Sequence, residues 1–224
     1  MSKIISVYGT MLIRSLGNTL LLTLLALVFA MIIGLIFALM NVGKNRFFNL
    51  IGTIYVDAVR GVPLIVLAYF IYFGIPQGIK MMGITNFRMT ALQAGTIALA
   101  MNCGAYMAEI IRAGIESVDK GQMEAARSLG LPYGTSMRLV VLPQAIRTMI
   151  PSIINQFIIT LKDTSILSVI GFPELTNTGK TISGNTMQVL QTWAVVAVMY
   201  LVVITALSKL AKYVERRLKR GKEQ

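Results

Sequence analysis

The chain has 224 residues, of which 55% are hydrophobic and only 13% are charged, whereas soluble domains carry about 25% charged residues, so the composition predicts an integral membrane protein. Histidine is absent and cysteine occurs once, which excludes Ser-His-Asp and Cys-His catalytic triads and argues against a zinc or iron site. The net charge of +12 does not predict a nucleic-acid-binding protein, because the basic residues lie between and after the apolar runs.

The apolar runs predict an all-α fold with five transmembrane helices, since a helix needs about 20 mostly apolar residues to cross a bilayer. The expected spans are residues 20–40, 53–76, 91–112, 151–171 and 189–210. Apolar residues at helical spacing in the N-terminal segment 1–18 predict a short interfacial helix lying on the membrane surface. Gly61 and Pro63 predict a kink or a delayed start in the second span, and Pro151 is expected to begin the fourth.

The lysine and arginine residues orient these spans. Fifteen of the 21 lie in the first loop and the start of the second span, in the stretch 112–147, or at the C-terminal end; five lie on the opposite side, and Lys162 lies within a span. The positive-inside rule then predicts an N-terminus outside the cell and a basic cytoplasmic tail over 213–224. The segment 113–150 is therefore expected in the cytoplasm.

This cytoplasmic segment predicts two short helices with a sharp turn between them. Residues 122–129 favour a helix, with Ser117 or Asp119 as its N-cap and Gly130 as the left-handed residue that ends it. A second helix is expected over 132–142, where Pro143 breaks or kinks it. A solvated linker is the simpler interpretation, but a linker does not need two capped helices, so the pattern favours a docking element.

The residues of this segment resemble a known motif. The sequence EAARSLGLPYGTSMRLVVLP over 124–143 is similar to the EAA loop of ABC importer permeases: Glu-Ala-Ala, three residues, Gly, nine residues, Ile, one residue, Leu-Pro. Val140 replaces the usual isoleucine. Further stretches look like the polar amino acid branch of these permeases: RGVP at 60–63, AYMAEIIRAGI at 105–115, GQMEAA at 121–126, PQA at 143–145 and KDTSI at 162–166. Val62 and Ile166 depart from that branch's usual threonine and leucine.

The resemblance covers about residues 17–211 and implies a single permease domain over 19–212 with the architecture of a type I ABC importer. It implies no enzymatic activity in this chain, because ATP and Mg²⁺ are bound by a separate ABC ATPase. It also implies a second permease subunit, identical or related, an extracytoplasmic amino acid-binding protein, and a place in the bacterial inner membrane. The residues expected to couple to the ATPase are Gln122, Glu124, Ala125, Ala126, Arg127 and Gly130.

One short sequence, TGKT at 178–181, resembles the end of a phosphate-binding loop. A Walker A loop needs a glycine where this chain has Glu174, and no βαβ unit surrounds the sequence. The chain itself is therefore not expected to bind ATP.

Two polar stripes inside the spans are the candidate substrate site. Each has the spacing i, i+4, i+7, which places its members on one helix face; the residues are Asn102, Tyr106 and Glu109 in the third span, and Gln156, Thr160 and Asp163 in the fourth. A zwitterionic amino acid needs a carboxylate for its ammonium group, supplied by Asp163 or less favourably by Glu109. The remaining polar side chains would bind its carboxylate.

Each acidic residue also has a structural interpretation, because charges inside membranes are usually paired. Asp163 can pair with Lys162 or cap a broken helix. Glu109 can pair with Arg112, and Asp57 with Arg60. These alternatives remain open at the level of sequence.

The ends of the last span carry two further signals. The polar stretch 172–188 predicts either a receptor platform outside the cell or a simple loop. Leu210, Val214 and Leu218, four residues apart among basic residues, predict a helix on the anionic inner leaflet.

Two other functional classes fit the composition. One is a self-contained carrier or channel that uses Asp163 and Glu109 as ion or proton sites, although the sequence has no internal repeat. The other is a non-transporting scaffold that holds a signalling partner. The EAA resemblance favours the ABC importer over both.

Overall fold

The computed structural model describes residues 2–43 and 45–220, with side chains described from 4 to 213 except at 44. The described part consists of helices joined by short connections. The elements are α1 (Ser2–Val42), α2 (Arg46–Gly61), α3 (Leu64–Tyr69), the π-helical η1 (Phe70–Gly74), α4 (Ile75–Met81), α5 (Ala91–Glu116), α6 (Lys120–Ser128), α7 (Tyr133–Ser136), the π-helical η2 (Met137–Val141), α8 (Leu142–Asp163), the 3₁₀-helical η3 (Thr164–Ile170), α9 (Leu175–Thr186) and α10 (Val189–Arg220).

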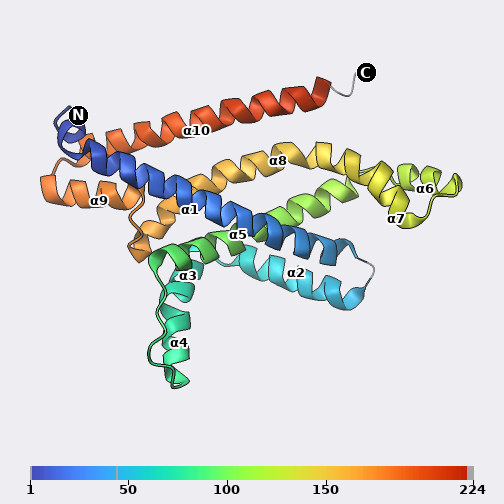
Figure 1. Ribbon diagram of the computed structural model, residues 1–224, viewed down its shortest axis with the longest axis horizontal. Helices are drawn as coiled ribbons and strands as arrows, with labels where there is room; N and C mark the ends of the chain where they lie inside the picture. Colours follow the sequence, from blue (N-terminus) through green and yellow to red (C-terminus); the bar gives the residue numbers. More distant parts are fainter. Residues whose placement is uncertain (1, 44, 221–224) are drawn as a thin grey trace.

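Within the described residues, five helical stretches are long and apolar enough to cross a membrane, which confirms the predicted all-α, five-span fold. They are Ile4–Val42, Leu64–Met81, Ala91–Glu116, Tyr133–Ile170 and Val189–Tyr213. The third stretch is the most buried, and Figure 1 shows why: α5 runs through the middle of the molecule, between α1, α2 and α8.

Small residues bring α1 and α5 together. A Cβ atom added at Gly34 of α1 would lie 2.5 Å from the Cβ of Met107, and one added at Gly104 of α5 would lie 2.7 Å from Ile33. Neither position has room for a side chain. Close helix contact through small residues is the usual way to gain packing where lipid supplies no hydrophobic driving force between helices.

The N-terminal segment differs from the prediction. The short separate helix expected over 1–18 is instead the beginning of α1, which runs unbroken from Ser2 to Val42. Ile4 and Leu12 are 2% exposed and belong to one apolar cluster with Leu175 and Ile182 of α9. The apolar face of the segment therefore packs on other helices of the chain, a contact that periodicity along one helix cannot reveal.

The second predicted span is two helices rather than one. The kink expected at Gly61 and Pro63 is confirmed, since Val62 is extended (φ −100°, ψ 128°) between α2 and α3. Proline disfavours a helical conformation at the residue before it. The expected single span over 53–76 is therefore wrong. In Figure 1, α2 lies beside the second half of α1, whereas α3 and α4 turn away from it.

The break expected at Pro143 is absent, and Pro151 lies inside α8 rather than at the start of a span. Helical structure continues from α7 through η2 into α8. In the π-helical turn of η2, the N–H group of Leu142 donates to the carbonyl of Met137, five residues earlier. A π-helical turn immediately before a proline accommodates its missing N–H group without ending the helix.

The segment over 172–188 forms a helix, α9, and the sequence TGKT lies within it. Beyond it, α10 continues past the predicted end of the fifth span as far as Arg220. Of the predicted basic tail, residues 221–224 lie outside the described part of the chain, as do the side chains of Val214 and Leu218.

Glu174 holds α9 against its neighbours. Its side chain is 0% exposed and accepts hydrogen bonds from the backbone N–H groups of Thr176 (2.7 Å) and Asn177 (2.5 Å) and from the hydroxyl of Tyr200 in α10 (2.9 Å). Thr19 of α1 accepts from the N–H group of Leu175 at 3.1 Å. Burial raises the pKa of the Glu174 carboxyl, and the hydrogen bonds that it accepts oppose that rise. One carboxylate thus caps α9 and links it to α10.

We expect Glu174→Ala to lower the midpoint of thermal unfolding of the purified protein by roughly 5–10 °C. The change removes an N-cap and leaves buried donors unpaired, which together cost about 3 kcal/mol. Thr181→Ala is the matched control on α9, because its hydroxyl only bonds the backbone of Asn177 at an exposed position. Equal melting midpoints for Glu174→Ala and Thr181→Ala would contradict this role.

Candidate functional site

The segment 113–150 forms the predicted helical hairpin, with α6 as its first helix. Asp119 caps α6 by accepting from the N–H group of Gly121 at 2.6 Å, as predicted. Gly130 has φ +84°, the left-handed conformation expected of it. The backbone N–H group of Gly130 donates to the carbonyl of Arg127 (2.9 Å), and the N–H group of Leu131 donates to the carbonyl of Ala126 (3.3 Å). These two bonds satisfy the last carbonyls of α6 and close the helix in the manner that glycine permits.

The side chains expected to couple to an ATPase divide into an outer and an inner group. Ala126 is only 5% exposed, so it packs within the chain and does not offer a small surface to a partner as expected. The outer group is exposed; its members are Gln122, Glu124, Ala125, Arg127 and Gly130. Figure 1 shows α6 and α7 at one end of the long axis of the molecule, well away from α9. The segment is therefore a projecting hairpin with a polar outer face.

The hairpin is tied to the spans. The side-chain amide of Gln144 in α8 donates to the side-chain oxygen of Gln122 in α6 at 3.3 Å. Ile115 of α5, Val141 and Met149 form one buried cluster at the base of the hairpin, against which Met123 packs. A force applied to α6 would thus reach both α5 and α8.

The polar stripe of α8 faces α5. Gln156 is 6% exposed and Thr160 is 1% exposed, and both interact through their side chains with the thiol of Cys103 in α5. Asp163 follows on the same side, half-buried and close enough to act electrostatically on Cys103. The structure therefore brings Gln156 and Thr160 of α8 to one contact with α5 and places Asp163 near it. Cys103 was not predicted for this site, because a lone cysteine in an apolar run gives no functional signal.

The stripe of α5 divides between two neighbours. Asn102 is 8% exposed and lies next to Cys103 in the buried part of α5. Tyr106 is half-buried, and its ring lies 5.1 Å from the guanidinium carbon of Arg60, in α2. Tyr106 thus connects the α5–α8 contact to α2.

Glu109 does not join Asp163. Its carboxylate forms a double contact with Arg112, at 2.5 and 3.2 Å, and an oxygen lies 3.8 Å from Arg60. Arg112 also donates to Glu116 at 2.6 Å. The paired interpretation of Glu109 is therefore confirmed, whereas the ion pair found for Arg60 is with Glu109 and not with the expected Asp57.

These ion pairs form one wall of a polar cavity of about 390 Å³. The cavity lies where the end of α1, the face of α2 and the end of α5 meet; its lining residues are Asn41, Asn49, Thr53, Val56, Asp57, Arg60, Glu109, Arg112 and Glu116. Its lining of amides, carboxylates and guanidinium groups suits a small charged solute rather than an apolar one.

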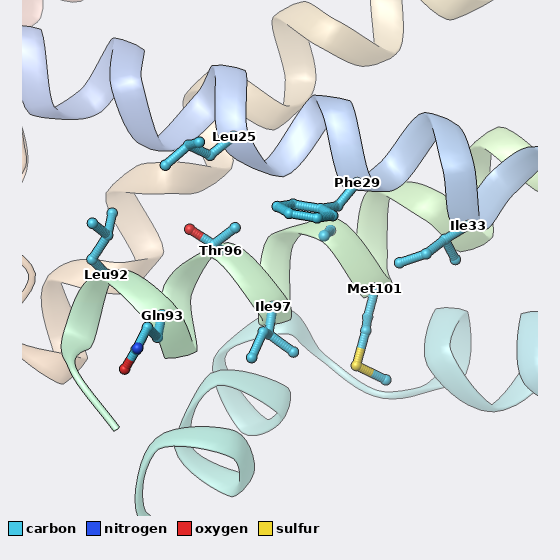
Figure 2. Close-up of a pocket in the computed structure, with 9 residues that line it drawn as sticks. Leu25, Phe29, Ile33, Leu92, Gln93, Thr96, Ile97 and Met101 are labelled. Atoms are coloured by element: carbon cyan, nitrogen blue, oxygen red, sulfur yellow. The ribbon is translucent and has the colours of Figure 1, made fainter. Parts of the chain in front are cut away.

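A second cavity, of about 380 Å³, is apolar. Figure 2 shows its lining side chains on two neighbouring helices, with Phe29 and Ile33 on α1 and Ile97 and Met101 on α5. Gln93 and Thr96 are its polar members. A polar amino acid would lose its hydration here without gaining charged partners, so this groove does not suit such a substrate.

Residues 30–220 match the family of binding-protein-dependent transport system inner membrane components. The chain is 38% identical to the probable glutamine ABC transporter permease protein GlnM of Bacillus subtilis (strain 168), covering 91% of each chain. It is 36% identical to the glutamine transport system permease protein GlnP of Escherichia coli (strain K12), covering 93% of each. A crystal structure of an amino acid ABC transporter with histidines matches with a TM-score of 0.87 and 40% identity, covering 94% of this chain and 95% of the other.

Proposed function

The chain belongs to the family of binding-protein-dependent transport system inner membrane components, and we propose that it carries a polar amino acid through the pathway that α5 and α8 line. It is a membrane permease subunit of an ATP-driven ABC importer, and ATP hydrolysis belongs to a separate subunit. The amino acid class follows from the relatives, which are permeases for glutamine and, in the crystal structure, an amino acid transporter.

The observation that carries the proposal is the polar contact of α5 and α8 within the spans. Gln156 and Thr160 meet Cys103 there, with the half-buried Asp163 nearby. An ionisable residue within a membrane span is by default a candidate for a solute pathway. Asp163 would bind the ammonium group of the amino acid. Asn102, Gln156, Thr160 and Tyr106 would contribute hydrogen bonds to the rest of it, and Glu109 would act from the separate polar cavity.

The exposed side chains of α6 are the proposed contact with the ATPase. Glu124 and Arg127 offer charge and Ala125 offers room for close approach, while Gln122 and Gly130 fix the position and the end of the helix. ATP and Mg²⁺ would be held by that ATPase. Closure of two ATPases would move two such hairpins together and open the spans outward.

The remaining partners follow from the geometry of a single subunit. Five spans around one polar contact enclose no pathway, so a second permease, identical or related, would supply the other half. The N-terminus and α9 would lie outside the cell, where α9 would face an amino acid-binding protein. The excess of basic residues around the α1–α2 turn, the hairpin and the end of α10 supports this orientation.

Family membership and the relatives favour ATP-driven import over the ion-coupled carrier and the scaffold. Glu109 is engaged with two arginines, so it is poorly placed to serve as an ion or proton site by itself. Of the two acidic residues that the carrier interpretation needs as ion or proton sites, only Asp163 is thus without an arginine partner among the described ion pairs.

Purification of the tagged protein from its host in mild detergent tests this function. We expect a nucleotide-binding ATPase to co-purify in stoichiometric amount, as measured by mass spectrometry. Ala125→Arg, at an exposed position of α6, should abolish the association, because a bulky side chain prevents close approach. Arg147→Glu, at an exposed position of α8 rather than of α6, is the control. A homo-oligomer without an ATPase would overturn the proposal.

A further inference from the structure

Of the polar cavity between α1, α2 and α5, only Glu109 has a part in the proposed pathway, and the charges of Asp57 and Arg60 in the same cavity are opposite in sign and three residues apart. We propose that it is a second amino acid site, near the cytoplasmic end of the pathway, in which Arg60 binds the α-carboxylate and Asp57 the α-ammonium group. This inference rests on the proposed import of an amino acid and on the proposed orientation. It adds a site that the transported solute would occupy after leaving Asp163.

The first support is the free capacity of Arg60. A guanidinium group has five N–H donors, and Arg112 uses its own on Glu109 and Glu116. Arg60 has a looser environment: its nearest carboxylate oxygen is at 3.8 Å, beyond hydrogen-bonding distance, and its other contact is the ring of Tyr106. Among the described contacts, no side-chain hydrogen bond is donated by Arg60. Its planar fork is therefore available to a carboxylate, the ligand whose geometry it matches.

The second support is Asp57. It is exposed, lines the cavity, and lies three residues before Arg60 on α2. Residues at that spacing are neighbours on the helix surface, about 5–6 Å apart at their Cβ atoms. An α-amino acid carries its two opposite charges on adjacent groups. One turn of α2 thus presents a cation and an anion at the separation that such a zwitterion requires.

The third support is the amphipathic character of α2. Its polar residues Asn49, Thr53, Asp57 and Arg60 face the cavity. The opposite face has large apolar side chains that are 40–65% exposed; they are Phe47, Leu50, Ile51 and Ile54. An exposed apolar face suits lipid, so the cavity opens on the side turned away from the bilayer. This orientation favours a water-borne zwitterion over a lipid head group.

The fourth support is continuity with the pathway. Tyr106 lies one helical turn beyond Asn102 on α5, and its ring contacts Arg60. Glu109, the next position on the same face, forms the wall of the cavity. A solute that moves along α5 from the α5–α8 contact would therefore reach Arg60 next. Figure 1 shows the α1–α2 turn at the same end of the molecule as α6, which is the end where release would occur.

Equilibrium binding of radiolabelled L-glutamine and L-arginine to the permease–ATPase complex in nanodiscs tests the site, without ATP or binding protein. Asp163→Asn removes the proposed pathway site, so the binding that remains reports the inner one. We expect saturable residual binding, and a loss of about tenfold or more in affinity when Asp57→Asn is added, since hydrogen bonds between charged groups have that strength. Both amino acids should be affected, because Asp57 and Arg60 contact only the backbone groups.

The choice of variants keeps the two proposals distinguishable. Asp57 has no ion pair in the described structure and is exposed, so Asp57→Asn should not affect folding, whereas Arg60→Gln also breaks the contact with Glu109. Arg46→Gln, an exposed arginine at the other end of α2, is the matched control and should leave binding unchanged. No saturable binding to Asp163→Asn up to millimolar concentrations, or equal binding with and without Asp57→Asn, would overturn the inner site. Binding that Asp163→Asn leaves intact and Asp57→Asn abolishes would instead overturn the pathway site.

Discussion

A permease with Glu124→Lys is expected to keep its fold and to lose ATP-driven uptake by at least about tenfold, because a reversed charge in a closely fitted contact costs several kcal/mol. The Glu124 side chain is exposed, and the hydrogen bond that Ser128 donates to Glu124 goes to its backbone carbonyl rather than to the carboxylate. The permease itself therefore has no need of this carboxylate. Uptake of radiolabelled L-glutamine into proteoliposomes containing the complete importer measures the effect.

Two further measurements separate coupling from folding for Glu124→Lys. The thermal unfolding midpoint of the permease should stay within about 2 °C of the wild type, as expected for a surface substitution. Arg147→Glu, which reverses an exposed charge on α8, should transport normally. Unchanged uptake and unchanged ATPase association in Glu124→Lys would show that α6 is not the docking helix.

Asp163→Asn has the second large expected effect, a reduction in uptake of about tenfold or more with assembly intact. The change keeps the shape of the side chain and removes the negative charge that would bind the ammonium group, and a charge-assisted hydrogen bond is worth about 1.5–3 kcal/mol. Substrate-dependent uptake should fall while the permease still co-purifies with the ATPase. Initial uptake rates across a range of amino acid concentrations provide the measurement.

Lys162→Gln is the matched control for Asp163→Asn. Lys162 is the adjacent charge in α8, but it is exposed, whereas Asp163 is half-buried. If Asp163 serves only to pair with Lys162, both variants should have the same small effect. Identical uptake kinetics in the wild type and in Asp163→Asn would remove this residue from the pathway.

Features that depend on neighbouring residues in the chain were predictable. The apolar runs are long enough to identify five spans, and they do so without any contact between helices. Asp119 caps α6 and Gly130 ends it, as their residue types predict. Pro63 forces the preceding residue out of the helical conformation. Each of these outcomes depends only on residues within one continuous stretch of the chain.

The predictions that were wrong concern features that depend on contacts or hydrogen bonds beyond the local sequence. The segment before the first span continues α1 because Leu175 and Ile182 cover its apolar face. Ala126 lies inward because the hairpin folds back on η2, which periodicity cannot detect. Pro143 is tolerated because the preceding turn widens to a π-helix. In each case the preference of the local sequence was outweighed by packing against another helix or by a change in the hydrogen-bond pattern of the backbone.

The same distinction between local and long-range features applies to the candidate site. The sequence by itself determined that this is a five-span membrane protein with a capped helical hairpin and polar stripes on two spans, because periodicity and capping act within one helix. Only the tertiary structure decided which stripe residues meet: it brings Gln156 and Thr160 to Cys103, places Asp163 near them, and directs Glu109 to Arg60. The rotation and crossing of packed helices decide such encounters, and these are properties of whole contact surfaces rather than of any one stretch of sequence.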